Sequence, residues 1–239
     1  MTSHRSNIVR FERDPDLLLE AFNQIENGTH LPPFAKRHGT KQYRSPYLTI
    51  NTKEKWIYTA AAKTGTTSIR RWLIGSTYIE YEILKELRKN IENPNHQSLH
   101  EFKKYIPDFK SYKKIVTVRN PFDRIASLFN ERAMIYNKQT FKDFVLDMKY
   151  SSDYCEHSAN LKYQYDWGYD DCIFIKLENI KESLHELSEI FNVKEENFTH
   201  HRKGKDKIIN DYRSIYTQEL IDHIYLNFNK DIEYFNYKF

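Results

Sequence analysis

A strand, a loop and the start of a helix follow one another without interruption between residues 56 and 72. The segment reads Trp56-Ile-Tyr-Thr-Ala-Ala-Ala-Lys-Thr-Gly-Thr-Thr-Ser-Ile-Arg-Arg-Trp72. Its apolar first part predicts a buried strand, and Ile69, Trp72 and Leu73 have the spacing of one apolar helix face. Gly65 allows a tight turn between the two elements. A strand that passes directly into a helix in this way predicts an α/β sheet.

The loop Lys63–Ser68, which joins this strand to this helix, has the composition of an anion-binding site. The N–H groups of a first helical turn and the positive end of the helix dipole favour a phosphate there. An ordinary P-loop reads Gly-x-x-x-x-Gly-Lys-Ser/Thr, whereas here Lys63 precedes Gly65 and no glycine lies upstream in the loop. The loop therefore resembles a P-loop without its nucleoside-triphosphate signature. A Thr-rich helix cap without a ligand is the alternative.

A second strand-to-helix junction lies further along the chain. An apolar strand over 114–118 ends at Arg119, whose guanidinium can bind a phosphate through two hydrogen bonds. Asn120 and Pro121 form a helix cap and first-turn pair. Ser127 lies eight residues beyond Arg119, close enough to share an anion with it.

For Arg119 the alternative is a structural ion pair with Asp108 or Asp123. Two strand-to-helix anion sites in one chain are nevertheless hard to explain structurally. Together they suit a ligand with two separated phosphates.

Strands and helices alternate along the rest of the chain. We expect strands over 47–50, 56–61, 114–118 and 172–176, and helices over 66–75, 81–89, 98–106, 121–136, 140–149, 179–191 and 217–228. This pattern predicts an α/β fold, a P-loop-like three-layer sandwich whose central, mostly parallel sheet is flanked by helices. We expect one domain over residues 1–239, in which residues 1–44 form a helix between Asp14 and Gly28 and then a loop.

Composition narrows the class of protein. The net charge is +4, which fits a nucleotide, an acidic sugar or a nucleic acid as partner, or simply a solvated Lys-rich surface. The two cysteines are too few for a disulfide framework and lack the spacing of metal ligands. We find neither the apolar core of a signal peptide at the N-terminus nor the roughly 18 consecutive apolar residues of a membrane span. A cytoplasmic location is therefore expected.

Taken together, these motifs resemble those of the sulfotransferases that use 3′-phosphoadenosine 5′-phosphosulfate (PAPS), especially the bacterial-like, soluble members of the carbohydrate branch. Lys63–Ser68 resembles the family's 5′-phosphosulfate loop, and Val118–Ser127 is similar to its 3′-phosphate motif. Ile173–Asn179 resembles the strand and acidic turn that follow, and Tyr212–Phe239 is like the C-terminal pattern of the bacterial members. The resemblance covers residues 45–239.

The resemblance implies transfer of a sulfuryl group from PAPS to an acceptor hydroxyl, expected on a carbohydrate or glycan, with no metal required. It implies that the 5′-phosphosulfate is held by Lys63, Thr64, Gly65, Thr66, Thr67 and Ser68, and the 3′-phosphate by Arg119 and Ser127. Arg202 and Lys203 stand where a basic loop closes over the nucleotide in related enzymes. The residues that follow, Lys205-Asp206-Lys207, depart from the family's Gly-Asp-Trp-Lys, so a solvated basic loop is the alternative.

Two residues are expected to act in the reaction. Lys63 can place its ammonium on the bridging oxygen as the bond to sulfur breaks. The acceptor also needs a base, and His96 fits the spacing to the apolar residues of the family's helix better than His100 does. His157 and Glu178 are weaker candidates for this base.

Two other functions remain open at this point. A small P-loop kinase would use ATP and Mg²⁺, and the missing Gly-x-x-x-x-Gly-Lys pattern counts against it. A basic nucleic-acid-binding module would use surface Tyr, Phe, Lys and Arg side chains, but no known nucleic-acid motif is present.

Overall fold

The computed structural model describes residues 49–73, 76, 83, 98–136, 140–148, 163–199, 209 and 211–239. Several of our expectations lie outside these residues: the helix between Asp14 and Gly28, most of the helix over 81–89, and the site candidates His96, His157, Arg202 and Lys203.

The described residues form one sheet whose strands lie in the order β1-β2-β3-β4. The strands are β1 (Thr49–Asn51), β2 (Trp56–Ala60), β3 (Lys113–Val118) and β4 (Ile173–Lys176). β1 and β2 form an antiparallel hairpin, whereas β2, β3 and β4 are parallel. Because Ala60 pairs with Thr117 and Val118 pairs with Lys176, the chain leaves all three parallel strands at the same edge of the sheet.

Six α-helices and five short 3₁₀ segments accompany the sheet in the described part of the chain. The helices are α4 (Thr66–Leu73), α6 (Leu99–Phe102), α7 (Pro121–Tyr136), α8 (Phe141–Asp147), α10 (Ile180–Phe191) and α11 (Gln218–Tyr234). The 3₁₀ segments are Phe109–Ser111, Tyr165–Trp167, Leu177–Asn179, Glu195–Asn197 and Tyr212–Ile215. None of the helices in these described ranges is long and apolar enough to span a bilayer.

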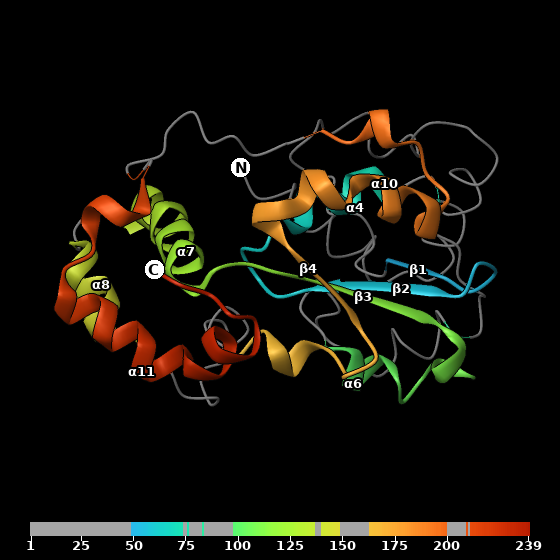
Figure 1. Cartoon of the computed structure of the whole chain (residues 1–239), viewed down its shortest axis with the longest axis horizontal. Coiled ribbons are helices and arrows are strands. Elements are labelled where there is room, and N and C mark those ends of the chain that lie inside the picture. The colour runs from blue at the N-terminus through green and yellow to red at the C-terminus, as the bar shows by residue number, and fades with distance from the viewer. Residues whose placement is uncertain are drawn as a thin grey trace, which may run out of the picture.

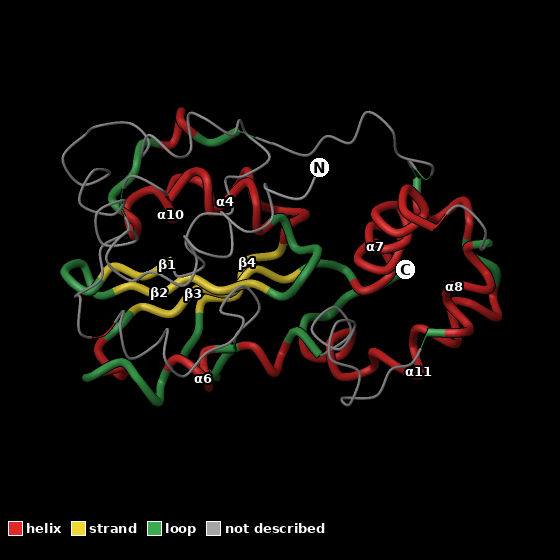
Figure 2. Tube along the Cα trace, turned by 180° about the vertical axis from the view of Figure 1, so that it is seen from behind, coloured by secondary structure: helices red, strands yellow, loops and turns green. Residues whose placement is uncertain are grey.

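Successive residues of β2 face opposite layers, as the pleat of a strand requires. Tyr58 packs with Trp72 of α4 and Phe191 of α10 in one apolar cluster. Its neighbour Ile57 packs with Leu99 of α6 in another. Helices α4 and α10 therefore cover one face of the sheet and α6 the other, as Figures 1 and 2 show from two sides. This arrangement confirms the expected three-layer α/β sandwich.

Helices α7, α8 and α11 lie beyond the carboxyl ends of the parallel strands (Figure 1). They share an apolar cluster in which Phe122 of α7 and Val145 of α8 meet Leu220, Ile224 and Phe228 of α11. The edge at which β2, β3 and β4 end is thus enclosed by helices, and ligands of parallel α/β sheets bind at this edge.

Two helices differ from their expected lengths. The helix expected over 98–106 is α-helical only over Leu99–Phe102. Pro107 disfavours helical backbone at Ile106, and Ile106 is buried in the core beneath the sheet. The C-terminal helix, expected over 217–228, continues to Tyr234 through a non-helical Phe228, because Ile232 still packs against the helical cluster.

A buried chain of hydroxyl groups connects β2, β3 and the loop after β2. Tyr58 Oη lies 2.9 Å from Thr117 Oγ1, which lies 3.2 Å from Thr64 Oγ1. The Thr64 hydroxyl donates to the carbonyl of Ala61 at 2.7 Å. Burial raises the pKa of Tyr58 to about 12, although its hydrogen bond to Thr117 opposes the effect.

This pKa predicts alkaline sensitivity that depends on Tyr58. Above pH 10 the phenol ionises in the unfolded chain before it does in the folded protein, where its pKa is about 12. The free energy of unfolding should therefore fall by about 1.4 kcal/mol per pH unit in this window because of Tyr58 alone. Urea unfolding of wild type and Tyr58→Phe at pH 8, 10 and 11 checks this. The variant should be about 1 kcal/mol less stable at pH 8 but should lose less stability as pH rises. Parallel pH profiles would contradict the assignment.

Candidate functional site

The loop after β2 has an unusual backbone. Lys63 adopts φ +70° and Gly65 φ +79°, whereas φ of the intervening Thr64 is not positive. Alternation of handedness turns successive N–H groups toward one side, which is the geometry of anion-binding nests. Left-handed backbone costs a non-glycine residue such as Lys63 about 1–2 kcal/mol. Strain of this kind at a helix start is a pointer to a binding role.

Gly65 is required by its neighbours as well as by its backbone. A Cβ atom at this position would lie 2.5 Å from Cδ1 of Leu177, the residue that follows β4. The end of β4 therefore packs directly against the loop after β2. Gly65 also accepts the first hydrogen bond of α4, from Ser68 N at 3.0 Å.

The hydroxyl groups of this loop fall into two kinds. That of Thr64 is completely buried and engaged with Ala61 and Thr117, so its side chain shapes the loop from within. Thr66 and Thr67 are half-buried in the first turn of α4, where the N–H groups of a helix start cluster, and the Thr66 hydroxyl makes only a long contact, 3.5 Å, to the Ala61 carbonyl. Ser68 is buried just behind them.

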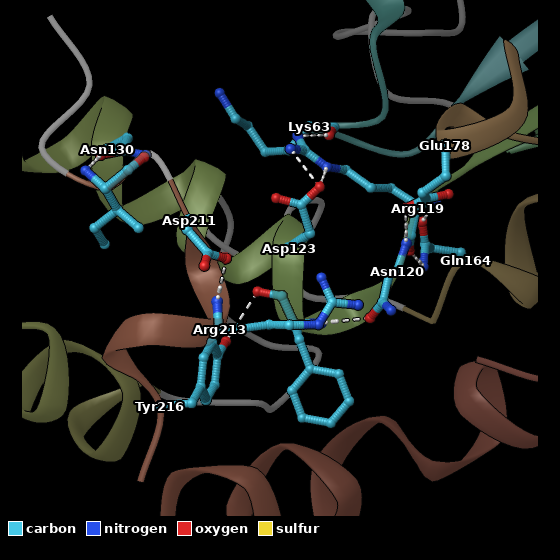
Figure 3. Close-up of polar contacts among 12 residues, drawn as sticks. Lys63, Arg119, Asn120, Asp123, Asn130, Gln164, Glu178, Asp211, Arg213 and Tyr216 are labelled. Atoms are coloured by element: carbon cyan, nitrogen blue, oxygen red, sulfur yellow. Dashed lines mark hydrogen bonds and ion pairs between the residues drawn. The ribbon is translucent and has the colours of Figure 1, made fainter. Parts of the chain in front are cut away.

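The Arg119 side chain joins the two motifs that the sequence singled out. It follows β3, and its Nη1 donates to the backbone carbonyl of Lys63 at 3.1 Å. Its Nε and Nη2 contact Oδ2 of Asp123, in the first turn of α7, at 2.8 and 2.7 Å. Figure 3 shows Lys63, Arg119 and Asp123 gathered at this point. The guanidinium is thus fixed between the loop after β2 and the start of α7.

Of the two ion pairs considered as alternatives for Arg119, the one with Asp123 is present. A guanidinium carries five N–H groups, and these contacts with described residues engage three of them. An ion pair of this kind orients the guanidinium and leaves donors for an anion.

The start of α7 is held by contacts of Asn120, two of them with distant parts of the chain. Asn120 caps the helix by accepting from Phe122 N at 3.1 Å. Its own N–H donates to Glu178 at 2.7 Å, and its side-chain amide donates to the carbonyl of Lys238 at 2.8 Å. Glu178, a weak candidate for the base, therefore has a structural contact here.

Ser127 lies on a half-buried face of α7, one turn beyond Asp123 and one turn before Asn130. The Asn130 side chain binds both backbone groups of Ile209, with Nδ2 3.0 Å from the Ile209 carbonyl and Oδ1 2.9 Å from its N–H (Figure 3). Ser127 thus stands between the Arg119–Asp123 pair and the point where the chain is fastened after the Arg202–Lys203 segment.

Of the two histidine candidates, His100 is the one within the described residues. Its ring contacts the ring of Tyr169 in a tilted arrangement, with centroids 4.1 Å apart. Tyr169 in turn contacts Phe109, which precedes β3, and Cys172, which precedes β4. His100 is therefore placed toward the amino ends of the strands, whereas Lys63 and Arg119 follow the carboxyl ends.

Three polar residues of this region were not predicted as site residues. Gln164 and Asp231 are fully buried, and Arg124 is 1% exposed. Arg124 Nε donates to the carbonyl of Ala62, directly before Lys63, at 3.1 Å. Burial, aided by the charge of Arg119 and opposed by Asp231, lowers the pKa of Arg124 to about 10, so it stays charged at neutral pH. The sequence signal was a second arginine in the segment Val118–Ser127, one turn into the helix.

A family model described as the sulfotransferase family matches residues 46–238. The chain belongs to this family. It is accordingly a transferase of sulfuryl groups, and the match includes both strand-to-helix junctions and the C-terminal helix α11. No curated protein and no solved structure matches the chain. Across the residues that the structure describes, no group of three or more His, Cys, Asp or Glu side chains could hold a metal ion.

Because Leu177 occupies the space beside Gly65, a single methyl group added at Gly65 should destabilise the folded protein. Gly65→Ala should lower the free energy of unfolding by about 1–3 kcal/mol, because it combines left-handed strain with overlap. The double variant Gly65→Ala/Leu177→Ala removes the overlap but retains the backbone strain. Urea denaturation of the two single variants and the double variant measures the coupling. Strictly additive losses would show that the overlap is relieved at no cost.

Proposed function

We propose that this sulfotransferase uses PAPS as donor and transfers its sulfuryl group to a hydroxyl of a carbohydrate or glycan, with release of 3′-phosphoadenosine 5′-phosphate. The observation that carries the proposal is the bond from Arg119 to the carbonyl of Lys63. It joins two strand-to-helix junctions into one surface, and in this proposal each junction binds one anion. A donor with phosphates at its 5′ and 3′ positions matches this pair of ends.

The loop Lys63–Ser68 fits the 5′-phosphosulfate end. The positive φ values of Lys63 and Gly65 favour a nest of N–H groups, and the start of α4 adds the positive end of a helix dipole. Thr66 and Thr67 supply hydroxyls in the first turn. In this proposal Thr64 shapes the loop, since its hydroxyl is engaged in the core.

Arg119 and Ser127 fit the 3′-phosphate end. Asp123 holds the guanidinium of Arg119, and Ser127 lies one turn further along the same face of α7. In this proposal Arg202 and Lys203 bind the nucleotide as well. Lys203 is six residues before Ile209, which Asn130 fastens to α7, and six residues span at most about 20 Å.

The chemistry is an in-line displacement at sulfur. A bond forms between the acceptor oxygen and sulfur while the bond from sulfur to the bridging phosphate oxygen breaks. The electron pair of the broken bond remains on the phosphate, and the acceptor proton passes to a base. Lys63 would stabilise the charge that develops on the bridging oxygen, together with the N–H groups at the start of α4. Such catalysis rests on positioning and electrostatics, and it requires no metal ion.

We assign the role of the base to His96 rather than His100. His96 precedes α6 by three residues in the sequence, and α6 lies on the face of the sheet opposite α4 and α10. The contact of the His100 ring with Tyr169, toward the amino ends of the strands, supports this choice. A histidine suits the role because its ordinary pKa lies near neutrality.

A carbohydrate acceptor is proposed because the two motifs resemble those of the carbohydrate branch, and the net charge of +4 favours an acidic glycan. The cytoplasmic location stays a prediction from composition. The match of residues 46–238 to a family of sulfuryl transferases counts against the two alternatives, an ATP-dependent kinase and a nucleic-acid-binding module.

Calorimetry with 3′-phosphoadenosine 5′-phosphate, compared with ATP plus Mg²⁺, tests the donor. Wild type should bind the former more tightly. Arg119→Ala should weaken this binding about 10–100-fold, the value of a charge-assisted contact. Lys63→Ala should lower kcat with PAPS by about 10²–10³, as loss of transition-state stabilisation does. Lys110→Ala, an exposed change before β3, serves as control and should alter neither quantity. Tighter binding of ATP plus Mg²⁺ than of 3′-phosphoadenosine 5′-phosphate would contradict the proposal.

Exchange of the two histidines tests the base. His96→Ala should keep the affinity for 3′-phosphoadenosine 5′-phosphate but lose about 10²–10⁴ in turnover, the usual contribution of a general base. His100→Ala is the matched control and should retain turnover. Steady-state transfer from PAPS, measured with each variant, decides between them. Full activity of His96→Ala would show that the base lies elsewhere.

A further inference from the structure

The side chain of Gln164 takes the place of a neighbouring strand at the end of β3. The ladder between β3 and β4 ends where Val118 pairs with Lys176. At the next residue, Arg119, the backbone N–H donates to Gln164 Oε1 at 2.8 Å and the carbonyl accepts from Gln164 Nε2 at 2.8 Å. Both backbone groups of the residue that we assign to the 3′-phosphate are therefore held by one side-chain amide, visible beside Asn120 in Figure 3.

The carboxylate of Asp231 on α11 fixes the orientation of that amide. Asp231 Oδ2 accepts from Gln164 N at 2.9 Å and from Gln164 Nε2 at 3.2 Å, and its Oδ1 accepts from Tyr165 N at 3.1 Å. An amide has distinct donor and acceptor ends. An ionised carboxylate can accept but not donate, so it faces the Nε2 end of the Gln164 amide. The Oε1 end is thereby turned toward the Arg119 N–H.

The same carboxylate also connects to the loop after β2. Arg124 Nη1 lies 3.9 Å from Asp231 Oδ2, and Arg124 Nε donates to the Ala62 carbonyl, next to Lys63. Arg119, which Gln164 holds, is bonded in turn to the Lys63 carbonyl, next to Ala62. The buried carboxylate of Asp231 thus contacts both Gln164, which holds the backbone of Arg119, and Arg124, which holds the residue before Lys63.

The contacts of Gln164, Asp231 and Arg124 have a positioning effect in addition to any effect on stability. A buried ion pair is often no more stabilising than apolar residues of similar volume, so burial of Asp231 and Arg124 is not explained by stability alone. Every polar contact described above for Gln164, Asp231 and Arg124 ends on the backbone of Ala62, Arg119 or the Gln164–Tyr165 turn, or within the trio. These contacts set where the two junctions stand relative to each other.

We infer that Asp231 and Gln164 are positioning residues that set the spacing between the two anion-binding ends, and so make the site prefer a nucleotide with a 3′-phosphate over one without. The inference rests on the proposed function, in which Arg119 binds that phosphate. A misplaced Arg119 would lose the 3′-phosphate while the loop Lys63–Ser68 still bound a 5′-phosphate. Selectivity between the two nucleotides is therefore the quantity to measure.

The test compares the dissociation constants of 3′-phosphoadenosine 5′-phosphate and adenosine 5′-phosphate by calorimetry. Gln164→Met keeps the length of the side chain and the Arg124–Asp231 pair but loses both bonds to Arg119. It should weaken binding of the bisphosphate at least tenfold and that of the monophosphate less than threefold. Asp231→Asn should shift the ratio in the same direction. Asp166→Asn is an exposed change in the 3₁₀ segment Tyr165–Trp167, which follows Gln164, and the ion-pair partner of Asp166 is Lys230. This variant should leave the ratio unchanged.

Each outcome bears on one of the two ideas. If wild type itself binds both nucleotides equally, the assignment of Arg119 to a 3′-phosphate is wrong. If wild type is selective and Gln164→Met keeps the same ratio, whether or not both affinities fall, the positioning role is wrong. If Asp231→Asn does not fold, Gln164→Met decides. Failure of Gln164→Met to fold, judged by circular dichroism, would also overturn the inference, because the amide would then be a requirement of the fold itself.

Discussion

The rest of the site depends on one hydrogen bond, from the guanidinium of Arg119 to the backbone carbonyl of Lys63. It connects the end of β3 with the loop after β2, across the edge at which both strands end. The carbonyl of Lys63 belongs to a residue with left-handed backbone, so the bond also helps to hold a conformation that a lysine disfavours. Asp123 anchors the other side of the guanidinium. Loss of this link would leave two separate helix starts instead of one bipartite surface.

The buried side chains around this link are polar, whereas most other buried side chains of the described residues are apolar. The two faces of the sheet pack through aliphatic and aromatic side chains, whereas the carboxyl edge is built with Gln164, Asp231 and Arg124. An apolar contact fixes little about direction, whereas a hydrogen bond has a preferred length and angle and so fixes where a backbone group stands. The fold therefore uses directional contacts at the edge where two phosphates would have to be matched.

Much of the fold could be predicted from local sequence pattern, and so could the two junctions. Strands β2, β3 and β4 and helix α7 were predicted within a residue or two, since apolar period and the Asn-Pro start are local signals. Gln164 could not be recognised, because its partners Arg119 and Asp231 lie 45 and 67 residues away. Helix α6 was overestimated since the effect of Pro107 competes with an apolar period that continues to Ile106. The roles of Lys63, Arg119, Ser127 and His96 remain predictions.

The bond between the Asn120 side chain and the carbonyl of Lys238 spans 118 residues of sequence. On a ribosome that adds roughly 5–20 residues each second, about 6–24 s separate the synthesis of its two ends. During that interval the turn at Asn120 lacks one of its supports. The junction after β3 is therefore completed late, by a segment that follows α11. Contacts this distant in sequence also slow folding in general, and this support of the Asn120 turn can form only after almost the whole chain has been synthesised.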